Sequence, residues 1–156
     1  MSDQPHQQDS DGRERLRFWF RAFGAVSAME REVAARLRER HGASLARFDL
    51  MAQLFAAPQG LRMGELTKKL LVTGGNVTGL VQRLEREGLV ERKADEADRR
   101  IAYVALTPEG LARFKQMAEE HVSWVNELLA ELDPRRLAQA AETLEQVRRH
   151  LLQRAG

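Results

Sequence analysis

Polar and basic side chains line one face of the segment TGGNVTGLVQRLEREGLV, residues 73–90. Wound as a helix at about 100° per residue, the segment has one apolar stripe, formed by Val77, Leu80, Val81 and Leu84. The opposite face carries small and hydrogen-bonding residues: Gly75, Thr78, Gly79, Gln82, Arg83 and Arg86. Glutamine can form two hydrogen bonds with adenine, and arginine can bind guanine or a phosphate. This face therefore has the chemistry to bind DNA.

Gly75 and Gly79 stand on the exposed face of this predicted helix, where a glycine costs about 1 kcal/mol relative to alanine. Packing against the protein's own core does not explain them, so we expect another molecule to approach the backbone closely. Asn76 and Thr78 are short polar residues at the helix start, where free N–H groups favour a phosphate. In the alternative interpretation, Gly74 and Gly75 serve only the turn, and the polar side chains form a solvated face.

Two lysines and a threonine extend the same predicted interface. Lys68 and Lys69 end the preceding helix, where they would contact backbone phosphates. Thr73 lies in the turn between the two helices. The formal net charge of the chain is only +2. Overall charge therefore does not identify an anionic partner, and local geometry must recognise it.

A second basic group lies in KADEADRR, residues 93–100. Arg99 and Arg100 fall at the tip of a predicted hairpin beside Asp98, whose carboxylate would orient a guanidinium through paired hydrogen bonds. A hairpin beside a DNA-binding helix can reach the minor groove, whose negative potential attracts arginine. A charged hairpin tip can also be simply solvated, and that alternative stays open.

The composition excludes several other kinds of chemistry. The chain has no cysteine, so disulfides, thiolate zinc sites and thiol-based redox sensing are excluded. Its four histidines have no metal-ligand spacing, and the sequence has no nucleophile–base pair, paired-carboxylate motif or phosphate-binding loop. No apolar run approaches the roughly 18 residues that a membrane span needs. We therefore expect no enzyme, metal, cofactor or membrane partner.

Apolar periodicity and capping residues predict a mainly helical chain with one hairpin. Ser44 and Thr107 precede two helices as N-caps, and Gly42 and Gly88 follow two others as terminators. Residues 1–12 lack an apolar signal core and are predicted to be a disordered cytoplasmic tail. Strands are expected at 89–94 and 101–106, and helices at 13–40, 45–56, 63–70, 74–87, 108–131 and from 134 onward.

These elements predict a winged helix-turn-helix at residues 45–107, a fold whose second helix enters the DNA major groove. Residues 13–44 and 108–156 would form dimerisation helices, because their apolar stripes are too extensive for so small a core. A homodimer is the simplest way to cover them. The last helix carries a regular apolar seam typical of a coiled-coil edge, formed by Leu137, Ala140, Leu144, Val147 and Leu151.

Three stretches together resemble the MarR family (multiple antibiotic resistance regulators) of dimeric bacterial winged-helix transcription factors. They are LARFDLMAQL, MGELTKKLLVTGGNVTGLVQRLEREGLVER and DEADRRIAYVALTPEG. The most specific feature is "DRR" before a strand that ends in LT-x-x-G. The resemblance implies a repressor, less often an activator, on a pseudo-palindromic operator. It also implies a recognition helix at 74–87 and Arg100 in the minor groove. Gly79 departs from the family, because many relatives carry a larger polar or basic residue there.

The resemblance further implies an effector that releases DNA, either a small aromatic carboxylate or a phenol. It would bind between the dimerisation helices and the winged domain, and an arginine amid aromatic rings suits a carboxylate on a ring. The residues expected there are Trp19, Phe20, Phe23, His41, Arg47, Phe48 and Met51. Alternatively, the aromatic residues belong to a dimer core and Arg47 is a surface cap.

A different function remains open from the sequence. A winged helix can also serve as a protein–protein interaction module that does not bind DNA. Such a module would keep the fold but would not need exposed glycines on the second helix or arginines at the hairpin tip. Substitution of Gly79 and Arg100 separates the two functions.

Overall fold

The computed structural model of the chain describes residues 5–70, 76–95, 98 and 101–154. Within these ranges the chain forms two compact units, one that ends at Val122 and one that begins at Ser123. None of the helices in the described chain combines the length and the apolar character that a membrane crossing requires.

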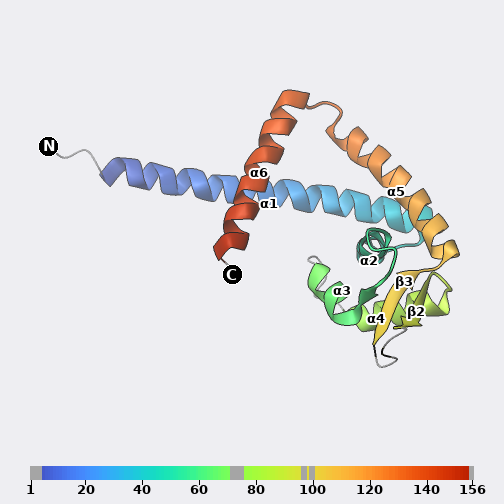
Figure 1. Cartoon of the computed structure of the whole chain (residues 1–156). Coiled ribbons are helices and arrows are strands. Elements are labelled where there is room, and N and C mark those ends of the chain that lie inside the picture. Colours follow the sequence, from blue (N-terminus) through green and yellow to red (C-terminus); the bar gives the residue numbers. More distant parts are fainter. Residues whose placement is uncertain (1–4, 71–75, 96–97, 99–100, 155–156) are drawn as a thin grey trace. The chain divides into compact units, whose positions relative to one another are not determined.

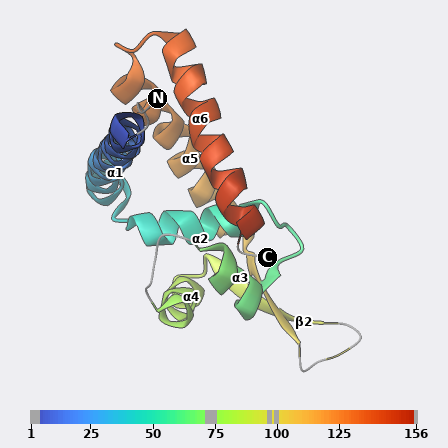
Figure 2. The same ribbon diagram turned by 90° about the vertical axis from the view of Figure 1, so that its left-hand side faces the viewer.

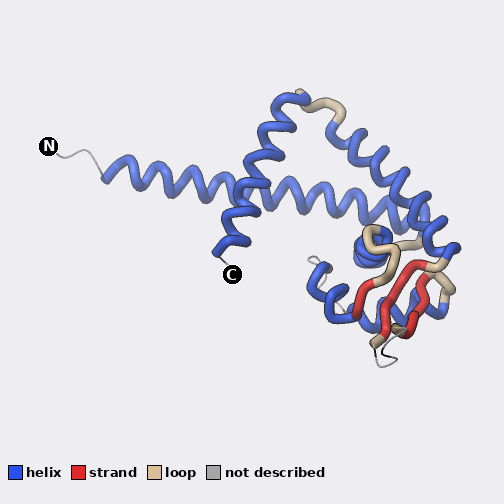
Figure 3. Tube along the Cα trace, viewed as in Figure 1, coloured by secondary structure: helices blue, strands red, loops and turns tan. Residues whose placement is uncertain are grey.

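The elements follow the order expected for a winged helix-turn-helix, and the predicted fold class, mainly helical with a small β wing, is confirmed (Figures 1 and 3). In Figure 2, α2 crosses above α3 and α4, and the wing strands project to one side. The elements are α1 (Pro5–His41), α2 (Leu45–Phe55), β1 (Leu61–Arg62), α3 (Met63–Lys69), α4 (Val77–Arg86), β2 (Val90–Ala94), β3 (Ala102–Leu106), α5 (Pro108–Leu129) and α6 (Pro134–Arg154).

The first helix is longer than the sequence pattern predicts. It begins at Pro5 and not at residue 13, so residues 5–12, expected in a disordered tail, are helical. Proline suits the first position of a helix because the missing N–H would have no intrahelical partner there. The glutamines that follow it are good helix formers. The helix ends at His41, and Gly42 follows with φ 59°, as expected of a terminating glycine.

The wing is a three-stranded antiparallel sheet in the order β1-β3-β2. The predicted hairpin is present as β2 and β3, with Val90 opposite Leu106 and Ala94 opposite Ala102. The sequence pattern missed β1, because a two-residue strand has no alternation to detect. Gly60 precedes it with φ 92°, and a Cβ there would lie 2.9 Å from the carbonyl oxygen of Val104. Only glycine fits this close approach of two strands.

The core of the first unit joins the winged helices to α1 and α5. Aromatic rings connect α2 to α5, since Phe114 lies 5.5 Å from Phe48 and 5.0 Å from Phe55 between ring centroids. The largest fully buried side chains are Leu37, Leu50, Met51, Leu54, Leu66, Val81, Leu84 and Val104.

The end of α4 and the start of α5 are tied together at one point. The Thr107 hydroxyl donates to the carbonyl oxygen of Gly88 at 2.6 Å and accepts from the amide of Gly110 at 3.0 Å. The amide of Thr107 donates to the carbonyl of Leu89 at 3.1 Å. A Cβ on Gly110 would lie 1.8 Å from that same carbonyl oxygen. The spacing of LT-x-x-G is therefore a steric requirement of this crossing.

The second unit contains the end of α5 and all of α6. Asp133 caps α6, and its carboxylate accepts from the amides of Arg135 and Arg136 at 2.9 and 3.0 Å. No residue of α6 is buried. Its apolar seam is exposed instead, with Leu144 at 45% and Leu151 at 58%.

Candidate nucleic-acid interface

The candidate recognition helix, α4, begins at Val77 because Asn76 caps it. The Asn76 side chain accepts a hydrogen bond from the amide of Gly79 at 2.8 Å and satisfies one of the free N–H groups of the first turn. The predicted start of this helix at residue 74 is therefore wrong, because α4 begins at Val77. Thr73 and Gly75 precede the cap and lie outside the described residues, so their predicted contacts with DNA stay predictions.

The two faces of α4 divide as the sequence pattern predicts. Val77, Val81 and Leu84 are buried, with Val81 and Leu84 fully so. The opposite face is exposed and polar. Nothing in the described chain covers this face, which therefore presents hydrogen-bonding groups to solvent. It is formed by Thr78, Gln82, Arg83 and Arg86.

Gly79 has a close neighbour within its own chain. A Cβ at this position would lie 2.7 Å from the amide nitrogen of the Asn76 side chain. The expectation that only another molecule could explain this glycine is wrong, because the capping side chain already occupies the space. The contacting atom is the far end of a flexible side chain, however, so a small substitution needs only a modest movement of the amide.

Two ion pairs hold the C-terminal half of α4. Arg47 of α2 contacts Glu87 at 2.6 Å between Nη2 and Oε2 and donates from Nη1 to Oε1 at 3.1 Å. Arg92 of β2 contacts both carboxylate oxygens of Glu85 at 3.1 and 3.2 Å. Such paired contacts fix direction as well as distance. The recognition helix is thus attached to α2 on one side and to the wing on the other.

These ion pairs were missed in the sequence, since their partners are far apart along the chain and follow no helical spacing. They also change the expected role of one residue. Arg47 was expected to bind a carboxylate of an effector, but its guanidinium already pairs with Glu87. Its role at an effector stays a prediction.

Basic residues flank α4 in the structure as they do in the sequence. Lys68 and Lys69 are exposed at the end of α3, the helix that precedes α4 in the chain. Arg62 occupies the N-cap position of α3, and its guanidinium lies 5.6 Å from the centroid of the Tyr103 ring on β3. This additional exposed cation lies at the base of the wing, and no pattern in the sequence sets it apart from other arginines.

Asp98 precedes the second predicted basic group and lies between β2 and β3. The amide of Asp98 donates to the Asp95 carboxylate at 3.0 Å, and the carbonyl of Asp98 accepts from Ile101 at 2.9 Å, so the hairpin closes through this residue. Arg99 and Arg100 follow it and lie outside the described residues. Their place in a minor groove stays a prediction.

The predicted effector residues do not form one site in this chain. Trp19 and Phe23 stack on each other with ring centroids 6.1 Å apart, and both are 61% exposed. Trp19 precedes His41 by 22 positions on the same helix, about 33 Å at 1.5 Å per residue. The neighbouring Phe20 is equally exposed, at 62%.

The remaining predicted effector residues belong to the core near the end of α1. Phe48 and Met51 are buried. Phe48 stacks on His121 with ring centroids 4.7 Å apart, and His41 lies 3.4 Å from a carboxylate oxygen of Glu120. One chain therefore separates the exposed aromatic residues of α1 from the arginine and the rings expected beside them.

A pair of titratable groups lies next to this aromatic stack. Burial raises the pKa of Asp49, nearby Glu30 raises it further, and His121 opposes the shift. Burial lowers the pKa of His121, and the negative charge of Asp49 offsets part of that effect. The joint between α2 and α5 therefore favours a neutral imidazole.

The chain is similar in sequence to known transcriptional regulators. A model of the MarR family matches residues 41–101, which extend from the end of α1 to the start of β3. The transcriptional regulator PecS of Dickeya dadantii is 29% identical over 107 residues, or 67% of this chain and 64% of PecS. The transcriptional repressor MdtR of Bacillus subtilis is 31% identical over 117 residues, which cover 69% of this chain and 75% of MdtR.

Solved structures give a similarity over more of the chain. A MarR family regulator from Silicibacter pomeroyi is 32% identical with a TM-score of 0.78, over 96% of this chain and 99% of that one. The regulator Sco3205 of Streptomyces coelicolor, solved in complex with DNA, is 26% identical with a TM-score of 0.75, over 88% of each chain.

Proposed function

Because this chain belongs to the MarR family of transcriptional regulators, we propose that it is a cytoplasmic repressor that binds DNA as a homodimer. Its target is a pseudo-palindromic operator, and a small aromatic acid or phenol releases it. The family is one of regulators and not of enzymes, in agreement with the absence of catalytic motifs from the sequence.

The exposed polar face of α4 carries this proposal. Thr78, Gln82 and Arg86 point away from a side that is buried against the core. A helix held in this way can enter a major groove, where glutamine and arginine distinguish base pairs. Two relatives support the proposal. Sco3205 was solved in complex with DNA, and MdtR is a transcriptional repressor.

Exposed apolar side chains support the homodimer. On α1, Leu16, Trp19 and Phe23 are each more than half exposed. On α6, the seam of Leu144 and Leu151 has no cover within the second unit. Contiguous exposed apolar surface of this kind marks a protein–protein interface, and a two-fold dimer covers the same surface on both copies.

The dimer gives the effector a means of action. Two recognition helices must lie about 34 Å apart to enter successive major grooves. A ligand that favours a different separation weakens DNA binding by its preference for that state. A ligand that binds tightly and leaves operator affinity unchanged would contradict this mechanism.

Fluorescence anisotropy with a labelled duplex from the region upstream of the gene tests the proposal. With six or more phosphate contacts, affinity should fall about 10³-fold or more between 50 and 200 mM salt. Gln82→Ala should weaken specific binding about tenfold, since a good base contact is worth about 1–3 kcal/mol. Gln116→Ala changes an exposed glutamine of α5 and serves as the matched control.

Substitutions on the polar face of α4 and between the wing strands separate the alternatives. Gly79→Leu adds bulk to the polar face of α4, and Arg100→Ala removes a cation from the segment between β2 and β3. Each should weaken duplex binding while the circular dichroism spectrum stays helical. Unchanged duplex affinity in both folded variants would favour an interaction module that does not bind DNA.

A further inference from the structure

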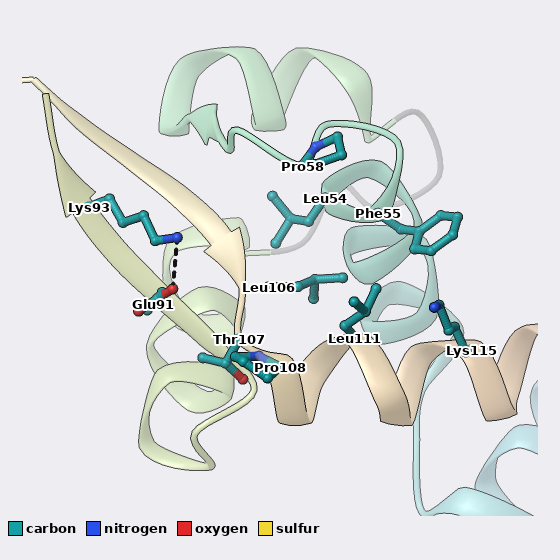
Figure 4. A pocket seen from close by; sticks show the side chains of 10 residues that line it. All are labelled: Leu54, Phe55, Pro58, Glu91, Lys93, Leu106, Thr107, Pro108, Leu111 and Lys115. Atoms are coloured by element: carbon teal, nitrogen blue, oxygen red, sulfur yellow. Dashed lines mark ion pairs between the residues drawn. The ribbon is translucent and has the colours of Figure 1, made fainter.

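The first unit contains a pocket away from the α1–α2 residues that the family resemblance indicates. It has a volume of about 580 Å³ and lies between the end of α2, the wing strands and the start of α5 (Figure 4). This volume is in the usual range for sites that hold small organic molecules, about 300–1,000 Å³. The middle of the pocket is apolar, with Leu54 from α2, Leu106 from β3 and Leu111 from α5.

The polar groups of the pocket differ in whether they are already paired with other groups of the chain. At one end, Lys93 is paired with Glu91 at 3.0 Å, so the two charges neutralise each other. At the other end, Lys115 lies beside Phe55 (Figure 4) and forms no ion pair with any residue that the structure describes. The Thr107 hydroxyl is already used by Gly88 and Gly110. Lys115 is thus the cation that an anionic group would meet.

We propose that this pocket binds an organic acid whose apolar body is larger than a single ring, with the acid group at Lys115. The leucines supply the surface that the body covers, and the ammonium supplies the charge that the acid requires. The proposal deepens the proposed function and rests on it for the role of the ligand, because it locates the effector here. The residues expected from the resemblance are dispersed, and their arginine is paired with Glu87.

The position of the pocket gives a bound acid direct contact with the DNA-binding parts. One wall consists of β2 and β3, the strands of the wing, and another is the first part of α5. The start of α5 is tied to the end of α4 through Thr107 and Leu89. A ligand in the pocket therefore contacts the wing and lies one step from the recognition helix.

Methyl NMR of the full-length protein, titrated with 2-naphthoate, tests the site. The methyl signals of Leu54, Leu106 and Leu111 should shift together and saturate. Lys115→Gln should weaken the fitted affinity about tenfold, the value of a hydrogen bond to a charged group. Arg113→Gln, which removes an exposed cation two positions away that pairs with Glu109, should leave it unchanged. Naphthalene-2-methanol, which has the same rings but no charge, should bind as weakly to the wild type as 2-naphthoate binds to Lys115→Gln.

The proposal is overturned if 2-naphthoate shifts other methyl signals and not those of the three leucines. It is also overturned if Lys115→Gln and Arg113→Gln bind 2-naphthoate equally well. Anisotropy with the duplex is measured in parallel. Failure of the protein to bind any duplex would refute the proposed function, while the leucine shifts would still decide whether the pocket is a ligand site. A decrease in duplex affinity with 2-naphthoate, absent in Lys115→Gln, is the expected regulatory result.

Discussion

Arg47 and Glu87 lie 40 positions apart in the chain and join the first turn of α2 to the residue that caps the end of α4, with a closest contact of 2.6 Å. The arginine side chain is 21% exposed and the glutamate side chain 44% exposed. The contact is therefore only partly screened by solvent. It holds the end of α4, the candidate recognition helix, to α2.

A double-mutant cycle measures this contact. Arg47→Met and Glu87→Gln each remove one charge, and the double variant removes both. We expect a coupling free energy of about 0.5–1 kcal/mol in urea unfolding, because a partly exposed pair lies at the upper end of surface ion pairs. The same cycle on Arg113 and Glu109, both at least 60% exposed, should give a value near zero. Equal coupling in the two cycles would contradict a structural role for Arg47.

Gly110 should be the least replaceable glycine in the wing region. Gly110→Ala places a Cβ 1.8 Å from the carbonyl oxygen of Leu89, and relief requires backbone movement that costs about 3 kcal/mol. Thermal unfolding followed by circular dichroism measures the loss. Gly64→Ala is the matched control, since a Cβ there meets nothing within 4 Å. It should be neutral or stabilising by up to about 1 kcal/mol. Similar effects of the two substitutions would show that the close crossing is absent in solution.

Charge on the α6 seam should disrupt the proposed dimer. Leu144→Glu and Leu151→Glu place carboxylates on exposed apolar positions that a second copy would cover, so the dissociation constant should rise at least tenfold. Light scattering across a dilution series measures it. Gln146→Glu adds the same charge off the seam and should leave the dimer intact. A wild-type protein that is monomeric at micromolar concentration would refute the dimer outright.

The pH dependence of stability should carry the signature of His121. Its pKa is lowered in the folded state by burial, so the unfolded chain takes up the proton first as the pH falls below about 6.5. Stability from the neutral imidazole is present at higher pH and is lost on acidification. The melting temperature should therefore fall more between pH 7.5 and 5.5 in the wild type than in His121→Gln. His150→Gln, at an exposed position on α6, should behave as the wild type does.

Local signals in the sequence predicted most of the winged unit. Three helix ends lie where the sequence predicts them, next to Ser44, Gly88 and Thr107. Such ends are predictable because caps and terminating glycines act through hydrogen bonds to near neighbours. The apolar stripe of α4 was correct because a period of 3.6 residues is repeated over several turns. These features need no knowledge of distant parts of the chain.

Features that depend on distant partners were not predicted. β1 exists only because β3 pairs with it, and the ion pair between Arg47 and Glu87 requires α2 and α4 to be brought together. The steric role of Gly79 depends on the rotamer of Asn76, which periodicity does not specify. The effector residues stay a prediction. Within one chain the length of α1 separates Trp19 and Phe23 from Arg47, and local patterns do not specify such distances.

The close contact of Leu89 with Thr107 and Gly110 also limits how α4 and α5 can move relative to each other. The Leu89 carbonyl accepts from the amide of Thr107, directly before α5, and lies so close to Gly110 that no methyl group fits there. The two segments therefore cannot slide past each other at this point. The C-terminal end of α4 and the N-terminal end of α5 must then move together. A signal that tilts the start of α5 is therefore expected to move the groove-facing surface as well, without a change in the internal structure of α4.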